Sequence, residues 1–281
     1  MKISDFERYS SLLKDQCGLV LSPEKSYLLD SRLLPVAKKW GYPTLSAMTM
    51  TLYGVPDPDL VKDIVEAMTD SETSFFRDAK PFHILGDIIL PYYAKNRKKN
   101  KELNIWSAGC AAGQEPYSIA MTIDQKQEHL RGCKVNIHAT DISTNVLDTA
   151  RAGVYNQYEI QNGLPVDMLL KYFDPLDKKS WKLKSTIKNM VQFDYFNLLQ
   201  DMDDRPEYDI IFCRNVISLF EKETQARVLE RMLDLLPEDG FLFLGENEKI
   251  NGITDSFKEM PDYSGLYILS DGHYKFSKKA A

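Results

Sequence analysis

Apolar residues recur at helical spacing through the first 70 residues of the chain. Phe6, Tyr9 and Leu12 begin the pattern, and Ser22-Pro23 opens the second of three further runs. The second run closes at Gly41, the third stops at Gly54, and prolines precede the fourth. The pattern predicts helices at 6–13, 22–41, 45–53 and 60–68, which form an N-terminal helical domain over residues 1–72.

From Pro81 onward, short apolar runs alternate with helical ones. The runs predict strands at 103–106, 135–140, 190–194, 209–213 and 241–245, and helices at 82–95, 119–125, 145–150 and 222–236. Such alternation is typical of an α/β domain with a mostly parallel sheet covered on both faces. Two short final strands, at 265–269 and 273–276, predict an antiparallel edge, so we expect a second domain over 73–281.

The segment 155–189 breaks this alternation. It contains Leu164-Pro165, Trp181 and a short alternating run, which predict a small inserted β-subdomain at about 156–190. Two interpretations stay open for this insertion. It is a docking surface, or it covers one edge of the main sheet.

A run of small residues, Ser107 to Gly113, follows the first predicted strand and leads into a helix with Pro116 in its first turn. Small side chains let a ligand lie against the backbone, and the N-terminus of the helix faces it, as in nucleotide-binding folds. The spacing is not GxGxxG, and a turn packed only on itself would have a similar sequence.

Polar residues stand at or near the carboxyl ends of four predicted strands, where open parallel sheets bind ligands. They are Glu115 after the first strand, Asp141 after the second, Asp194 with Asn197-Leu198 after the third, and Cys213-Arg214-Asn215 after the fourth. An acidic residue in the place of Asp141 can accept both ribose hydroxyls. Its alternative role is to cap the next helix along with Ser143. Arg214 at a buried strand end is costly unless it is paired or used.

The junction between the two predicted domains carries the sequence Thr-Ser-Phe-Phe-Arg-Asp at 73–78. Phe75 and Phe76 are expected to pin the junction together. Arg77 either pairs with Asp78 or a helix end, or points into a ligand site and orients a carboxylate.

Composition narrows the class of protein. A net charge of −6 and a pI near 5.4 argue against a nucleic-acid binder, and the 281 residues contain no apolar run of membrane-spanning length and no signal peptide. Four scattered cysteines without a CxxC pair suit a reducing cytoplasm and free thiols, and four histidines without ligand spacing argue against a metal site. The basic run at 95–101 is interpreted as a solvated helix end.

Taken together, these segments resemble the CheR family of chemotaxis-receptor methyltransferases. The matching pieces, in family order, are TSFFRD, WSAGCAAGQEPYSIA, ATDIS followed by VLDTARAGVY, FNLL and YDIIFCRNV. The resemblance implies a class I SAM-dependent methyltransferase fold, Rossmann-like with a seven-stranded sheet, behind the helical domain. It further implies methyl transfer from S-adenosylmethionine (SAM) to receptor glutamates, which leaves S-adenosylhomocysteine (SAH).

The resemblance also implies site residues. The SAM site is expected at Ser71, Thr73, Arg77, Ala108, Glu115, Asp141, Asn197, Leu198, Cys213, Arg214 and Asn215, with Arg77 also the catalytic residue. Because a glutamate is ionised at neutral pH, it needs no general base, and an arginine that stays charged can orient it. The implied partner is the cytoplasmic helical domain of a chemoreceptor, with the enzyme a cytoplasmic monomer.

Three positions depart from the family pattern. Leu219 stands where the family has a tyrosine, Ser71 where it often has Asn, and Gly245-Glu246-Asn247-Glu248 where it often reads Gly-His-Ser-Glu. Leucine has no hydroxyl with which to place a substrate. The alternative hypothesis is therefore a CheR-like protein that binds SAM or SAH with weakened or no turnover and acts in signalling or interaction. A small-molecule methyltransferase on the same fold is a third hypothesis, which the helical domain and the junction disfavour.

Overall fold

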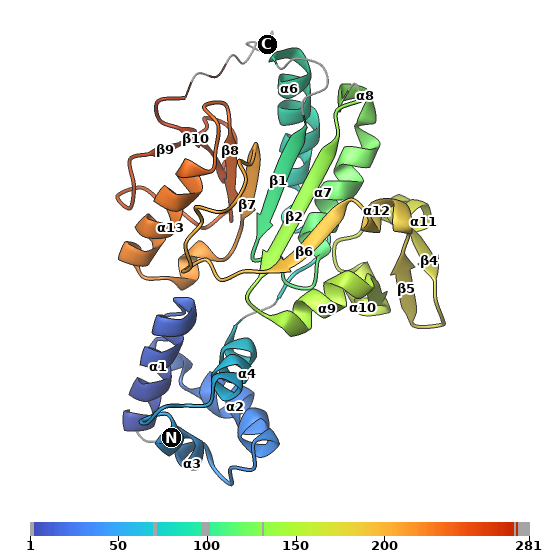
Figure 1. Ribbon diagram of the computed structural model, residues 1–281. Coiled ribbons are helices and arrows are strands. Elements are labelled where there is room, and N and C mark those ends of the chain that lie inside the picture. Colours follow the sequence, from blue (N-terminus) through green and yellow to red (C-terminus); the bar gives the residue numbers. More distant parts are fainter. Residues whose placement is uncertain (1–2, 70–71, 97–101, 131, 273, 275–281) are drawn as a thin grey trace.

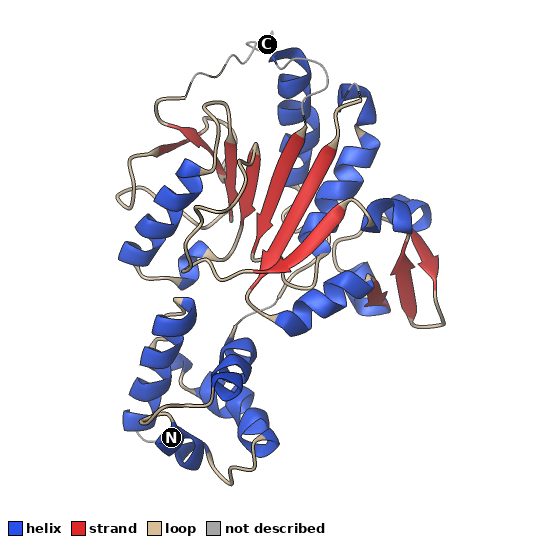
Figure 2. Ribbon diagram, in the orientation of Figure 1, coloured by secondary structure: helices blue, strands red, loops and turns tan. Residues whose placement is uncertain are grey.

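The computed structural model describes residues 3–69, 72–96, 102–130, 132–272 and 274. A unit of helices stands below the carboxyl ends of a twisted sheet, and a small second sheet projects from the side (Figures 1 and 2). The predicted residues Ser71 and 97–101 lie outside the described part of the chain.

The first unit contains four helices, as the apolar spacing predicts. They are α1 (Ile3–Cys17), α2 (Tyr27–Lys39), α3 (Leu45–Thr51) and α4 (Pro58–Met68), with a 3₁₀ turn at Pro23–Lys25. Their apolar faces enclose a core of their own around Tyr9, Leu13, Leu29, Met48 and Ile64. The Thr44 side chain caps α3 and the Asp57 side chain caps α4, so the polar residues before these helices fix their starts.

The main sheet has seven strands in the order β6-β2-β1-β7-β8-β10-β9. Their bounds are β1 Leu103–Ala108, β2 Val135–Asp141, β6 Val191–Tyr195, β7 Ile210–Cys213, β8 Phe241–Leu244, β9 Phe257–Glu259 and β10 Leu266–Leu269. Strands β6, β2, β1, β7 and β8 are parallel, and β10 runs antiparallel to both of its neighbours. The α/β fold and its antiparallel edge are therefore confirmed.

The outer strand of that edge was placed wrongly by the sequence pattern. It is β9, which precedes β10, and no strand is assigned at Tyr274, the one described residue of 273–276. The Tyr274 hydroxyl donates to the Gly240 carbonyl at 2.6 Å, and its ring packs on Phe241. The aromatic residue that suggested a strand is thus a partly buried anchor for the start of β8.

Successive residues of the central strands enter different cores. Ile105 and Phe212 belong to the core under α5 (Lys80–Ile84), α6 (Leu90–Asn96) and α7 (Gln114–Gln125), whereas Trp106 and Ile211 belong to the core under α13 (Lys222–Asp234). This is the two-sided burial expected of a parallel sheet. A π turn at Leu85–Ile89 joins α5 to α6, and α8 (Gln127–Leu130) and α9 (Thr144–Ala152) flank β2.

The insertion folds as an antiparallel three-stranded sheet in the order β3-β5-β4. Its elements are β3 (Val154–Asn156), α10 (Gln157–Gln161), α11 (Val166–Tyr172), β4 (Phe173–Pro175), β5 (Ser180–Leu183) and α12 (Ser185–Lys188). Phe75, from the junction, packs edge-on against both Tyr155 and Phe173 at centroid distances of 5.0 and 5.6 Å. Phe75 therefore fixes the junction segment to the insertion and to the core of the sheet domain.

Candidate functional site

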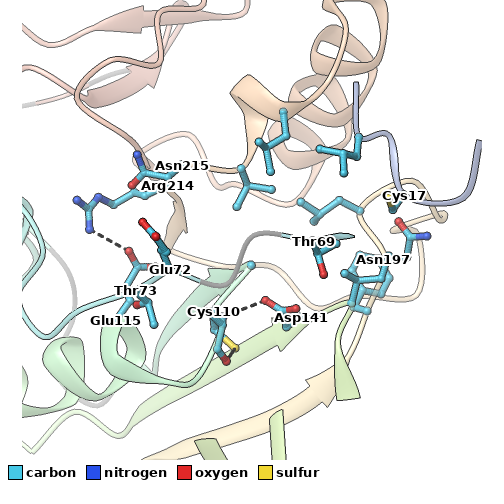
Figure 3. A pocket seen from close by; sticks show the side chains of 18 of the residues that line it. Cys17, Thr69, Glu72, Thr73, Cys110, Glu115, Asp141, Asn197, Arg214 and Asn215 are labelled. Carbon is cyan, nitrogen blue, oxygen red and sulfur yellow. Dashed lines mark hydrogen bonds and ion pairs between the residues drawn. The ribbon is translucent and has the colours of Figure 1, made fainter. Parts of the chain in front are cut away.

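A cavity of about 250 Å³ lies at the carboxyl ends of the central strands, between the sheet and the helical unit (Figure 3). Both units contribute to its wall. Its lining residues are Cys17, Leu19, Thr69, Glu72, Thr73, Arg77, Gly109, Cys110, Ala111, Glu115, Asp141, Ile142, Phe196, Asn197, Leu198, Arg214, Asn215, Val216, Leu219 and Phe220.

The small-residue turn after β1 forms the floor of this cavity. Gly109 has φ +78°, and a Cβ there would lie 2.5 Å from Val216 Cγ2, so both the conformation and the space require glycine. Ala111 also has positive φ, at 47°, and its amide donates to Asp141 Oδ2 at 2.9 Å. At Gly109 the turn presents bare backbone to the cavity, as expected for a ligand that lies against it.

Asp141, at the end of β2, holds the adjoining loops together. Its Oδ1 accepts from the Ser143 amide at 2.9 Å, and its Oδ2 accepts from Ala111. Burial raises the pKa of Asp141, the amides of Ser143, Ala111 and Ile142 oppose the rise, and the Glu66 carboxylate adds to it. Asp141 thus bonds to the N-cap residue of α9, which is part of its alternative role as a helix cap. The same carboxylate also lines the cavity.

Arg214, after β7, is the buried cation of the site. Its side chain is 2% exposed, and it forms ion pairs with Glu115 at 3.0 Å and Asp78 at 2.5 Å. Glu115 also accepts from the Ser107 hydroxyl at 2.8 Å. The buried arginine at the end of β7 is therefore compensated by two carboxylates, so its burial leaves no unpaired charge.

Arg77 does not take the pairing with Asp78 that the sequence allowed. Its Nη1 donates to the Glu72 carbonyl at 3.0 Å, and no carboxylate of the described residues lies within 4.0 Å of its guanidinium. Asp78 pairs with Arg214 instead. The Arg77 side chain is partly exposed and lines the cavity, so a positive charge is available there to an incoming anion.

Asn197 connects the two units beside the cavity. Its Nδ2 donates to the Gln16 carbonyl at the end of α1 at 2.7 Å, and its Oδ1 accepts from the Leu199 amide. Leu198 is buried next to it and lines the same wall. The amide group predicted to face a ligand is thus partly occupied in joining α1 to the loop after β6.

The predicted residues divide into three groups. Thr73, Arg77, Glu115, Asp141, Asn197, Leu198, Arg214 and Asn215 all line the cavity. Ala108 and Cys213 are fully buried in β1 and β7 and are absent from its lining, so their place beside a ligand stays a prediction. Ser71 lies outside the described residues.

Glu248 was missed by sequence reasoning. It is 5% exposed, and its carboxylate accepts from the amides of Asn215, Ser218 and Gly245 and from the Ser218 hydroxyl. These bonds hold the turn after β7, where Asn215 adopts φ +61°. The chain departs from the Gly-His-Ser-Glu pattern at 246–247 but keeps the glutamate. This retained glutamate was the signal in the sequence that could have identified it.

Cys17, Leu19 and Thr69, also missed, come from the helical unit. Cys17 and Leu19 are far in sequence from the other lining residues, whereas Thr69 lies just before Glu72 and Thr73. All four cysteines are free thiols. Among the described residues, no cluster of histidine, cysteine and carboxylate side chains is placed to hold a metal ion. A search of the same residues finds no helix with the length and apolarity to cross a membrane.

Comparison with known proteins matches two family models to the chain. The model described as the all-alpha domain of CheR methyltransferases covers residues 4–69, and the one described as their SAM binding domain covers 71–265. The chemotaxis protein methyltransferase Cher2 of Pseudomonas putida is 36% identical over 93% of this chain and 96% of its own length. Chemotaxis protein methyltransferases of Vibrio parahaemolyticus and Vibrio cholerae are 39% and 38% identical, each over 90% of this chain and 92% of the relative.

Proposed function

The chain belongs to the CheR methyltransferase family, and we propose that it methylates glutamate side chains of chemotaxis receptors. It is a SAM-dependent methyltransferase of the class I fold, with SAH as its product. The observation that carries the receptor proposal is the meeting of Arg77, Glu115 and Asp141, from three separate family motifs, at one cavity. The relatives named for chemotaxis support the same substrate.

The residues of the cavity fit SAM. The bare backbone at Gly109, where a Cβ would collide with Val216, leaves room for a ligand against the turn. Asp141 would accept the ribose hydroxyls, and the Glu115 and Glu72 carboxylates would attract the ammonium group of the methionine part. We also propose Thr73, Asn197, Leu198, Arg214 and Asn215 as cofactor-binding, together with Ser71, Ala108 and Cys213.

For the methyl transfer, the protein has to place the two reactants and to exclude water, and little more. Bound SAM supplies an electrophilic methyl group on a sulfonium. The receptor glutamate arrives ionised, so no residue has to remove a proton. Arg77, without a described carboxylate partner, would orient that glutamate by a charge-assisted hydrogen bond, and because its guanidinium stays protonated it does not neutralise the nucleophile. The helical unit, through Cys17 and Leu19, covers the cavity from solvent.

Several finer points belong to the same proposal. The protein acts in the cytoplasm, as a monomer, on the helical cytoplasmic part of a receptor. The helical domain spans 1–72 and the methyltransferase domain 73–281, with the inserted β-subdomain at about 156–190. The net charge of −6 agrees with a protein rather than a nucleic-acid partner.

Leu219 supports a second candidate function, a family member that binds SAM or SAH and turns over slowly. Its side chain lines the cavity, packs against the cores of both units and carries no hydroxyl. The loss of one positioning hydrogen bond typically costs about 1–3 kcal/mol, or roughly ten- to a hundredfold in rate. Catalysis would then be weakened without being abolished.

The test combines binding and turnover. SAH binding is measured by calorimetry for the wild type and for Asp141→Ala, and methyl transfer is measured with methyl-labelled SAM and a purified receptor cytoplasmic fragment. Label released as methanol by base would support the proposed reaction. Tight SAH binding without base-labile label would favour the second candidate. Absence of SAH binding would reject both.

A further inference from the structure

Glu66, near the end of α4, reaches out of the helical unit to the methyltransferase domain. Its Oε1 accepts from the Thr144 amide and from the Thr144 hydroxyl, each at 2.7 Å. Its other carboxylate oxygen accepts from the Asn145 side-chain amide. One partly buried carboxylate thus accepts three hydrogen bonds from the first two residues of α9.

These bonds replace a cap that α9 lacks in its own sequence. The helix begins at Thr144, and its N-cap residue Ser143 forms no side-chain capping hydrogen bond. The first amides of a helix have no partner within it and favour a nearby negative charge. Glu66 therefore supplies from another domain what a capping side chain supplies locally.

The capped residues continue directly into the cofactor wall. The amide of Ser143, next to Thr144, donates to Asp141 Oδ1 at 2.9 Å, and Ile142 lines the cavity. On the other side, Thr69, three residues after Glu66, lines the same cavity. The position of Glu66 is thus linked to two parts of the wall that belong to different domains.

We propose that Glu66 is a positioning residue for cofactor binding, which holds the Asp141–Thr144 loop in the conformation that presents Asp141 to the ribose. This inference rests on the proposed role of Asp141. Under this proposal, the contact between α4 and α9 contributes to ligand affinity and also joins the two domains. The negative charge of Glu66 also adds to the raised pKa of Asp141, after the larger effect of burial, which places the two carboxylates in one electrostatic environment.

Asp63 offers a matched control on the same helix. Its Oδ2 accepts from Lys39 Nζ and Trp40 Nε1, both at 2.7 Å, and both partners belong to the helical unit. Asp63→Ala therefore removes a well-bonded carboxylate from α4 and leaves the contact with α9 intact. Melting temperatures of both variants show how much each destabilises the fold.

The experiment measures SAH affinity by calorimetry in the full-length chain. We expect Glu66→Ala to weaken SAH binding by roughly 2- to 30-fold, the range of a lost helix cap. Glu66→Gln keeps an acceptor for Thr144 and should recover most of the affinity, and Asp63→Ala should bind as the wild type does. Because Glu66 is proposed to act through Asp141, Glu66→Ala should have little further effect in the Asp141→Ala background.

Three outcomes overturn the inference. One is equal loss in Glu66→Ala and Asp63→Ala, which would assign the effect to helix stability alone. A second is unchanged affinity in Glu66→Ala. The third is a loss that adds in full to that of Asp141→Ala. If Asp141→Ala itself leaves SAH affinity unchanged while the wild type binds, the ribose assignment fails instead, and with it the premise for Glu66.

Discussion

Arg214 and Glu115 form an ion pair across 3.0 Å that joins the end of β7 to the first turn of α7 at the cavity wall (Figure 3). The same guanidinium donates to the Arg77 carbonyl at 3.0 Å, so the pair also fixes the backbone that carries Arg77. Both charges are largely removed from water, with side-chain exposures of 2% and 12%. A residue first suspected of binding a ligand therefore organises three segments of the site.

Arg214→Met tests this organising role. The change leaves Glu115 and Asp78 without their cation, and an uncompensated buried charge typically costs about 3–5 kcal/mol. We expect the free energy of unfolding in urea to fall by roughly this amount, with SAH affinity reduced as well. Lys134→Met is the control, because its pair with Glu102 is exposed and such pairs contribute about 0–1 kcal/mol. Equally small losses in both variants would contradict the assignment.

The fold was predictable because its signals are local and repeated. Apolar spacing marks α1 to α4, and the alternation of strands and helices marks the sheet. The failure at the sheet edge has a physical cause. The three-residue β9 is too short for a periodic signal, whereas Tyr274 contributes a single anchoring contact to the Gly240 carbonyl and is not assigned to a strand.

The site was predictable where it follows strand ends, as at Asp141 and Arg214. It was not predictable where a distant segment closes it, as Cys17 and Leu19 do, because nothing in their own surroundings marks a cavity. The ion pairs of the site could not be predicted from the sequence either. Asp78 stands next to Arg77 in the chain, yet its ion pair is with Arg214, 136 residues away.

Arg77 should affect turnover more than cofactor affinity. A charge-assisted hydrogen bond to the substrate carboxylate contributes about 1.5–3 kcal/mol, so Arg77→Ala should lower kcat/KM roughly ten- to a hundredfold. Arg77→Lys keeps the charge without the fork of donors and should fall in between. The measurement is methyl transfer at saturating SAM, with the exposed Arg227→Ala as control. Unchanged kcat/KM in Arg77→Ala would remove this residue from the mechanism.

Leu219→Tyr asks whether the missing hydroxyl limits the reaction. Leu219 lines the cavity and packs against two cores, so the added ring must be accommodated at this wall. We expect roughly ten- to a hundredfold higher kcat for Leu219→Tyr if one positioning hydrogen bond is restored. Leu219→Phe adds the ring without the hydroxyl and should show no such gain. A gain shared by both variants, or by neither, would mean that the hydroxyl is not the missing element.

SAH affinity should decline on acidification because of Asp141. Burial is the main cause that raises the pKa of this carboxyl above 3.8, so its proton returns at a higher pH than in the unfolded chain. The ionised group therefore destabilises the free protein above that pKa, and the penalty is relieved as the pH falls. Ligand binding has the opposite sign, since only the carboxylate accepts both ribose hydroxyls.

Calorimetry from neutral pH down towards the ordinary aspartate value checks this prediction. The wild type should lose SAH affinity on the way, by up to about tenfold per pH unit below the pKa of Asp141. Asp141→Asn should bind more weakly at neutral pH and show a flatter profile. A wild-type profile parallel to that of Asp141→Asn would assign the pH dependence to another group.

Gly18 and Gly41 provide a matched pair for testing how α1 closes the cavity. Both follow a helix and have positive φ, at 75° and 77°. A Cβ at Gly18 would lie 2.7 Å from the Phe220 ring in the cavity wall, whereas a Cβ at Gly41 meets nothing within 4 Å. Gly41→Ala should therefore lose about 1–2 kcal/mol of stability from backbone strain alone and bind SAH normally.

Gly18→Ala carries the same strain and must also displace Phe220, which is 8% exposed and has little room to move. Two residues after Gly18, the Val20 amide donates to the Leu219 carbonyl at 3.0 Å. A shift of the Phe220 ring therefore disturbs this contact too. We expect a larger loss of stability than in Gly41→Ala and, in addition, weaker SAH binding. Equal effects of the two variants on both measurements would show that α1 does not shape the cavity through Phe220.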